Sequence, residues 1–491
     1  MNAEKKGFTE DKTALLLGTF IFVIAMLNFA GMNWLGWIVR ARTWLDPVLM
    51  FNATGSGTAK TIGGWMSPAA TGWISLFLTW AGITTLLAVG AKLMKADVVA
   101  FVKAFTLIFF VAYICYGIGN YAYIAVAPTE KALAAAKITW SIGLSGEAGY
   151  IVALIVGIIV GNFMPGVAEA MRPACRPEMF VKIAIIIMGA ELGVKAAEAI
   201  GLAGHVVFRG LCAIVEAYLI YWAAVYYVSR KYFKFSREWA APLASGISIC
   251  GVSAAIATGG AIRARPVVPI MVSSLVVVFT CIEMLILPFV AAWGLHSEPM
   301  VAGGWMGLAV KSDGGAIASG AISEALILAK AAAVDGVTYQ PGWVLMVTTT
   351  VKIFIDVFIG IWSMLLAYIW CTKFDTSGTA SSVSWGAVLD RFPRFVIGYI
   401  LTFLILLFLS LHSKELFKAG TAMTSNINSL RTLFFLMTFF TIGVISNFRR
   451  LWAEGIGRLA AVYCVCLFGF IIWIGLFISW LFFHGIKPPL A

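Results

Sequence analysis

Long apolar stretches are the feature that most constrains how this chain can fold. An α-helix needs about 20 largely apolar residues to cross a bilayer, and stretches of that length recur along the whole sequence. Their continuity excludes a transmembrane β-barrel, whose strands would alternate between apolar and polar residues. Hydrophobic residues make up 61% of the chain and charged residues 12%, with a mean hydropathy of +0.94. The sequence therefore predicts an all-α polytopic membrane protein.

Apolar continuity and length predict about thirteen membrane crossings. The N-terminal sequence MNAEKKGFTEDK is too polar for a cleaved signal, so the first apolar run is expected to remain as a helix. We assign residues 1–146 to an N-terminal extension with about three spans, and residues 147–491 to the core of the protein. The predicted spans cover residues 13–32, 69–90, 98–122, 149–162, 180–193, 205–228, 239–262, 267–293, 303–333, 342–370, 395–411, 433–447 and 459–483.

The net charge of +12 comes from basic residues in the loops between predicted spans. Such residues set topology and contact anionic lipid, so the charge gives no reason to expect nucleic acid as a partner. Their uneven distribution predicts a multi-pass protein of the inner (plasma) membrane, with a cytoplasmic N-terminus and an external C-terminus. The eight cysteines lack metal-site spacing and are expected to be buried apolar residues. The basic groups on the predicted cytoplasmic side include Arg172, Arg176, Arg230 to Arg237, Lys373 to Arg394, Arg449 and Arg450.

One apolar region, SGISICGVSAAIA at residues 245–257, has an unusual composition for a membrane-spanning helix. It is rich in small residues, and Gly246 and Gly251 each weaken a helix by roughly 1 kcal/mol relative to alanine. The hydroxyls of Ser248 and Ser253 can bond backbone groups that a helix break would leave free. We predict a span broken near Cys250 and Gly251, as in transporters that build a polar site at mid-membrane depth. The alternative is an unbroken helix whose small residues let a neighbour approach closely.

A second irregular apolar segment contains VKSDGGAIASG at residues 310–320. A charge at the bilayer centre costs about 2.5–3.5 kcal/mol on insertion scales, so Lys311 and Asp313 need a protein-lined or watery environment. Gly314 and Gly315 allow the backbone to turn, and a half-helix restarting there would present its N-terminus to an anion. The alternative is an interfacial loop with solvated charges.

Further ionisable residues fall inside predicted spans. Lys352 and Asp356 are four residues apart and share one helix face. They suit either a proton or ion path or a self-satisfied pair near the membrane edge. Glu191, Glu216 and Glu283 are also intramembrane acids by these boundaries, and each is chemically able to carry a proton.

At SGISICGVSAAIA the chain resembles the YeiH-like family of bacterial membrane proteins, in which an ICG-x-SA motif recurs. Four further pieces occur in the family's order: IVALIVGIIVGN, GGWMGLAVKSDGGAIASG, the lysine at Lys352, and LFFLMTFFTIGVISNFRRLWAEGIGRL. The resemblance covers roughly residues 147–491. It implies a fold shared with cation–proton antiporters and bile-acid-type transporters, built from inverted repeats with crossed broken helices. It also implies export of sulfate, sulfonates or related small anions.

The chain departs from the family's pattern near the second segment. Family members tend to have His where Lys311 stands, an acid near Ser312, and Gln where Gly315 stands. An Arg expected after Lys352 is absent, and Asp356 lies nearby instead. Replacing a titratable His by Lys removes a proton switch near neutral pH, so substrate and coupling are expected to differ from those of typical members.

The leading hypothesis is a secondary transporter that exports a small anion such as sulfate or a sulfonate. The alternative is a cation–proton antiporter with Asp313 or Asp356 as the carrier, and a channel is less favoured because no repeated filter motif is present. No enzymatic activity, cofactor, metal or nucleic acid is expected; the expected partners are the anion and the lipid bilayer, and homo-oligomerisation is left open. The predicted substrate-binding residues are Ser248, Cys250, Gly251, Ser253, Lys311, Ser312, Asp313, Gly314, Gly315 and Lys352.

Overall fold

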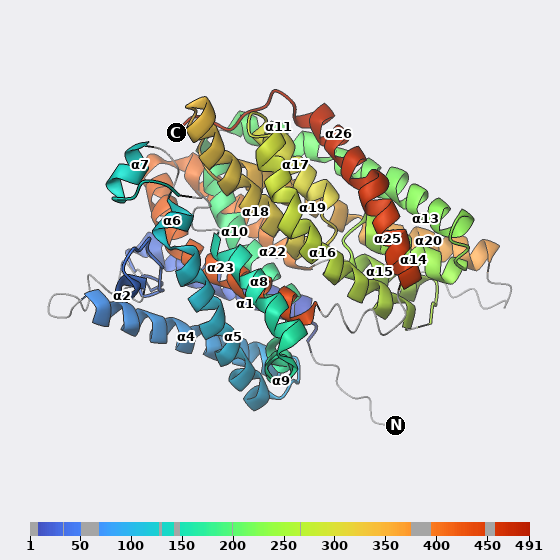
Figure 1. The fold of residues 1–491 in the computed structure, drawn as a ribbon, viewed down its shortest axis with the longest axis horizontal. Helices are drawn as coiled ribbons and strands as arrows, with labels where there is room; N and C mark the ends of the chain where they lie inside the picture. Colours follow the sequence, from blue (N-terminus) through green and yellow to red (C-terminus); the bar gives the residue numbers. More distant parts are fainter. Residues whose placement is uncertain are drawn as a thin grey trace. The chain divides into compact units, whose positions relative to one another are not determined.

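The computed structural model of this chain describes nine stretches of the sequence, which are almost entirely helical (Figure 1). They contain no β-strand, only the isolated bridges Trp44–Tyr121 and Tyr339–Leu490. The predicted all-α fold is therefore confirmed for the described part of the chain. That part comprises residues 8–32, 34–50, 68–126, 130–141, 148–198, 200–265, 267–374, 394–446 and 457–491.

Ten helical segments are long and apolar enough to cross a membrane. An eleventh results if Ala148–Phe163 and Pro165–Ala174, bent by 114°, are counted as one span. The expected thirteen crossings are thus not confirmed among the described residues. The ten segments are Glu10–Ala30, Gly72–Leu93, Val98–Gly119, Ile200–Lys231, Val267–Gly294, Asp313–Asp335, Trp343–Trp370, Arg394–His412, Lys414–Ile445 and Gly457–Phe483.

The chain divides into two compact units. Unit 1 comprises residues 1–202, 332–337 and 394–445, and unit 2 comprises residues 203–331, 338–393 and 446–491. The predicted boundary between an N-terminal extension and a core, at residues 146 and 147, remains a prediction.

Unit 1 contains long helices that pack through glycines. Gly157 and Gly443 bring two of them together: a Cβ on Gly157 would lie 3.0 Å from the Gly443 Cα, and it would collide with the Phe440 carbonyl. The absence of side chains at these positions therefore allows backbone-to-backbone contact. The helices are α1 (Glu10–Met26), α4 (Pro68–Leu93), α5 (Val98–Gly119), α8 (Ala148–Phe163), α10 (Pro177–Glu198), α22 (Arg394–His412) and α23 (Lys414–Ile445).

Shorter helices complete unit 1 and the connections at its edges. Helix α9 begins at Pro165, and the short 3₁₀ turn that starts at Arg172 directly follows its last residue, Met171. The short elements are η1 (Leu27–Ala30), α2 (Pro47–Met50), α6 (Ala122–Ala125), α7 (Glu130–Ala135), α9 (Pro165–Met171) and η2 (Arg172–Ala174).

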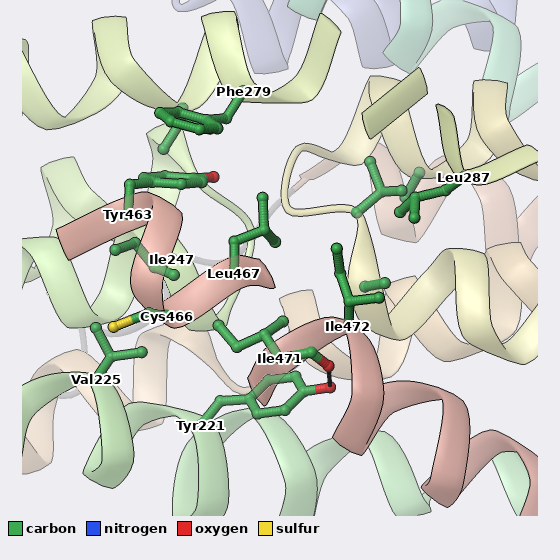
Figure 2. Close-up of a cluster of buried hydrophobic side chains, with 14 of the residues drawn as sticks. Tyr221, Val225, Ile247, Phe279, Leu287, Tyr463, Cys466, Leu467, Ile471 and Ile472 are labelled. Atoms are coloured by element: carbon green, nitrogen blue, oxygen red, sulfur yellow. Dashed lines mark hydrogen bonds between the residues drawn. The ribbon is translucent and has the colours of Figure 1, made fainter. Parts of the chain in front are cut away.

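Unit 2 contains short half-helices as well as long helices. Its core is an apolar cluster in which Phe279 stacks on Tyr463 with ring centroids 4.2 Å apart (Figure 2). The elements are α12 (Cys212–Val215), η3 (Glu216–Tyr221), α13 (Trp222–Lys231), α14 (Arg237–Ser248), α15 (Val252–Ala261), α16 (Val267–Gly294), α17 (Pro299–Ala309), α18 (Asp313–Lys330), α19 (Trp343–Val357), α20 (Ile359–Lys373), α25 (Gly457–Cys466), η5 (Leu467–Ile471) and α26 (Ile472–Phe483). Helix α11 (Ile200–Gly210) lies largely in this unit, and η4 (Ala331–Asp335) follows α18.

Two predictions from the sequence are not fully confirmed by the structure. Cys464 is exposed and Cys175 is half-buried, so the expected burial of the cysteines is wrong at Cys464. The basic pair Arg449 and Arg450 lies outside the described residues.

Candidate functional site

The first chain break lies between α14 and α15. Helix α14 ends at Ser248, and Gly251 has φ +69° and ψ −107° before α15 begins at Val252. A Cβ on Gly251 would lie 2.8 Å from the Lys311 carbonyl oxygen and 2.5 Å from the Val276 side chain. Both the backbone conformation and the close approach therefore require glycine. The predicted break near Cys250 and Gly251 is confirmed, and the unbroken-helix alternative is wrong.

The second break lies between α17 and α18. Helix α17 ends at Ala309, Val310 is extended, and α18 begins at Asp313. The Ser312 hydroxyl caps α18 by accepting a 3.0 Å hydrogen bond from the Gly315 amide. A Cβ on Gly315 would lie 2.6 Å from that hydroxyl, so the missing side chain leaves room for the cap.

Burial excludes one alternative for this second segment. Every residue from 310 to 320 is buried, including Lys311 and Asp313. The segment is therefore not an interfacial loop with solvated charges. Gly314 lies in the first turn of α18.

Lys352, on α19, joins the two breaks. Its ammonium donates hydrogen bonds to the carbonyl of Ile249 at 3.0 Å and to that of Val310 at 3.4 Å. These residues directly follow the last residues of α14 and α17. Helix C-termini carry partial negative charge, so one buried cation stabilises both half-helix ends.

Acidic groups and a thiol lie beside this ammonium. The Asp313 carboxylate is 3.9 Å from the Lys352 nitrogen. The Cys250 sulfur and carboxylate oxygens of Asp313 and Asp356 lie within 4.8 Å of one another, and all three residues are buried. The atoms are close enough to share a proton or a cation. We call Cys250, Asp313, Lys352 and Asp356, with the two breaks, the crossing.

Lys352 and Asp356 are each 1% exposed. They lie inside the protein; whether they form an ion path or a self-satisfied pair near the membrane edge stays a prediction. Their predicted position on one helix face is retained, since both belong to α19.

The ammonium of Lys311 contacts a different set of groups. It donates a hydrogen bond to the carbonyl of Leu308 and lies 4.3 Å from the ring centroid of Tyr221. The Lys311 backbone amide donates to the Glu283 carboxylate at 3.3 Å. Sequence reasoning grouped Lys311 with Lys352 as suppliers of positive charge and left Glu283 and Tyr221 outside the predicted site.

Hydroxyl groups add polar character to the buried half-helices. Among the described residues, Ser248, Thr280 and Ser319 each have a buried hydroxyl oxygen with no hydrogen-bond partner. Thr280 also lies against Gly315, because a Cβ on Gly315 would collide with its methyl group. These hydroxyls are available to a ligand. Ser253 belongs to α15, but its side chain lies outside the described residues.

Sequence comparison finds relatives of this chain among membrane proteins. A family model described as "Conserved hypothetical protein 698" matches residues 124–462. A UPF0324 membrane protein of Nitrosomonas europaea is 36% identical over 485 residues, which cover 98% of this chain and 97% of the relative. A UPF0324 membrane protein of Rhodopirellula baltica is 28% identical over 401 residues, covering 80% of this chain and 65% of the relative. No solved structure matches this chain.

Proposed function

This chain belongs to the membrane-protein family described as conserved hypothetical protein 698, and we propose that it is a secondary transporter for a small anion. One observation carries the proposal: two buried chain breaks in unit 2 meet at a single lysine, Lys352. Broken helices that face each other in this way build the substrate sites of many secondary transporters. Such breaks leave backbone groups free inside the protein, where a ligand can bind them.

Three features support an anionic substrate. The half-helices α15 and α18 begin at the crossing, and helix N-termini carry partial positive charge. Lys352 supplies a buried cation beside them. The hydroxyls of Ser248 and Thr280 are hydrogen-bond donors of the kind that bind oxyanions. Sulfate or a sulfonate is our proposed substrate class, consistent with the resemblance to the YeiH-like family.

The acidic groups favour a second candidate function. Asp313 and Asp356 lie with Cys250 next to the one ammonium of Lys352. An anion entering this site would meet two carboxylates, which repel it unless they are protonated. A cation–proton antiporter would instead use these carboxylates to exchange a cation for protons.

Thermal stabilisation of the detergent-purified protein distinguishes these functions. A ligand that binds the folded form raises stability by RT ln(1 + [L]/Kd), so sulfate, sulfonates, carboxylates, chloride and sodium are compared at high concentration. We expect sulfate or a sulfonate to raise Tm, and Lys352→Met to remove the shift. Lys330→Met is the matched control. Lys330 is the last residue of α18, and its ammonium donates an exposed hydrogen bond to the Trp293 carbonyl.

Two outcomes would contradict the proposal. One is an anion-induced shift that is unchanged in Lys352→Met, which would place the anion away from Lys352. The other is a shift with sodium alone that disappears in Asp313→Asn or Asp356→Asn, which would identify the antiporter. If Lys352→Met does not fold, Lys352→Arg retains the charge and tests whether the precise ammonium position matters.

The remaining aspects of function follow the same reasoning. We propose that the protein lies in the inner (plasma) membrane with its N-terminus cytoplasmic, because basic loop residues favour that side. We also propose that it catalyses no covalent reaction. Reporter fusions at each terminus test the orientation, and a periplasmic signal from an N-terminal fusion would contradict it.

A further inference from the structure

A second group of buried charges lies in unit 2, outside the crossing. Glu216, Lys311 and Glu283 come from η3, the break before α18, and α16 respectively. Their side chains are 0%, 0% and 1% exposed. We call these three residues the glutamate–lysine cluster.

The backbone and side chain of Lys311 contribute separately to this cluster. Its amide bonds the Glu283 carboxylate at 3.3 Å, while its ammonium lies over the Tyr221 ring and on the Leu308 carbonyl. Tyr221, whose ring the ammonium contacts, belongs with Glu216 to η3. Lys311 is therefore the basic residue that lies with these two acids.

Glu216 is positioned by a π-helix. Glu216 and Tyr221 are the first and last residues of η3, and π-helical turns are frequent at functional sites. The Tyr221 hydroxyl donates a 2.7 Å hydrogen bond to the carbonyl of Ile471, which ends the π-helix η5 (Figure 2). A Cβ on Gly475 would lie 2.7 Å from that hydroxyl and 3.5 Å from a Glu216 carboxylate oxygen. The glycine thus leaves room for both polar groups against α26.

Among the described residues, the neighbouring groups do not balance the charge of the cluster. Cys212 and Tyr221 face Glu216, and Tyr463 faces Glu283; all three are neutral when protonated. Lys352 acts on Glu283 and on Lys311, but it lies 3.9 Å from Asp313 at the crossing. With both glutamates ionised, the cluster would hold two negative charges and one positive charge. An uncompensated buried charge is so costly that such groups normally take up a proton instead.

We propose that the glutamate–lysine cluster binds one proton on Glu216 or Glu283, balanced by Lys311, and that this proton is coupled to transport at the crossing. The coupling rests on the proposed function, whereas proton binding does not. The proton adds to one carboxylate oxygen on loading and leaves it on release, with no other bond changed. Lys311 connects the two sites, since it directly precedes the Ser312 cap and its carbonyl lies against Gly251.

Infrared spectroscopy of the purified protein tests proton binding without any substrate. We expect the C=O stretch of a protonated carboxyl group at neutral pH, shifted in D₂O and by isotope-labelled glutamate. The band should be lost in Glu216→Gln or Glu283→Gln. Glu191→Gln is the matched control, because the Glu191 carboxylate forms a 2.7 Å ion pair with Arg431 in unit 1, away from the cluster in the sequence. A band that is absent, or insensitive to labelled glutamate, overturns the proposal even if a glutamine variant does not fold.

Flux into proteoliposomes under an imposed pH gradient then tests the coupling. The variant that loses the band should lose the gradient-driven part of transport and retain the ligand-induced Tm shift. Gradient-driven flux that persists in this variant would overturn the coupling and leave the proposed substrate site intact. Loss of every ligand-induced shift in the wild-type protein would instead count against the proposed function, while the infrared result would still decide proton binding.

Discussion

Glycines serve different purposes at two places, one in each unit. In unit 1, α8 and α23 meet at Gly157 and Gly443, within the two helices, where the missing side chains allow backbone contact. In unit 2, α14/α15 and α17/α18 are interrupted, and the freed carbonyls are bonded by Lys352. Glycine allows close helix packing in the first case and a break between two helices in the second. Only the second use exposes backbone groups that can bind a ligand.

The buried acids of unit 2 also differ from one ion pair of unit 1. In unit 1, Glu191 is paired with Arg431 at 2.7 Å, one acid to one base, and both remain partly exposed. In unit 2, the crossing has two carboxylates beside Lys352, and the glutamate–lysine cluster has two beside Lys311. A balanced pair is suited to holding helices together. An acidic excess is suited to binding protons or ions.

The largest expected effect is at the first break. Gly251→Ala combines positive φ, at about 1–2 kcal/mol, with overpacking, at about 1–3 kcal/mol. We expect a loss of about 2–5 kcal/mol in the free energy of unfolding and loss of the ligand-induced Tm shift. Gly260→Ala is the control, because its added Cβ meets open space in the same helix. Equal stability of the two variants would break the distinction between the units.

A glycine in unit 1 should affect stability without affecting ligand binding. Gly157→Ala places a Cβ against the Phe440 carbonyl, and we expect overpacking to lower the unfolding free energy by about 1–3 kcal/mol. The ligand-induced Tm shift should persist at temperatures where the variant is folded. Gly166→Ala, with open space around its Cβ, is the control. Loss of ligand binding in Gly157→Ala alone would show that unit 1 also shapes the site.

The smallest effect is expected at exposed ion pairs, where the units should behave alike. Arg172 pairs with Glu169 in unit 1 at 3.2 Å, and Arg265 pairs with Glu238 in unit 2 at 2.9 Å. Solvent screening makes such pairs weak, so Arg172→Gln and Arg265→Gln should both unfold nearly as the wild type does. A much larger effect of Arg265→Gln in thermal unfolding would extend the difference between the units to their surfaces.

Local composition was enough to predict the first chain break, where small residues surround Gly251. The second break lies at residues 310–312, and Gly314 and Gly315, where a turn was expected, are in the first turn of α18. The number of membrane spans was harder to predict because α14, α15 and α17 have 12, 10 and 11 residues, each shorter than a full span. Helix α23 begins at Lys414, well before the predicted span at 433–447. The prediction missed this start because the first turns of the helix carry polar residues, and the span was assigned from its apolar residues.

The grouping of the buried charges was not predictable from one sequence. Glu216 and Glu283 were recognised as acids within spans, but spacing along the chain does not say which spans touch. The side chain of Lys311 illustrates the limit. Its neighbour Ser312 caps α18, whereas its own ammonium lies on the Tyr221 ring from η3. Side-chain direction at a chain break depends on tertiary packing rather than on helical periodicity.

The bonds of Lys352 also constrain the order in which the protein matures during synthesis. Ile249 leaves the ribosome 103 residues before Lys352, and Val310 leaves 42 residues before it. Until α19 follows, the C-terminal carbonyls of α14 and α17 lack this buried partner, and unsatisfied carbonyls are costly in lipid. The two half-helix pairs therefore complete their assembly only after α19 has entered the membrane. A nascent chain that stops before Lys352 would expose these ends to quality-control proteases.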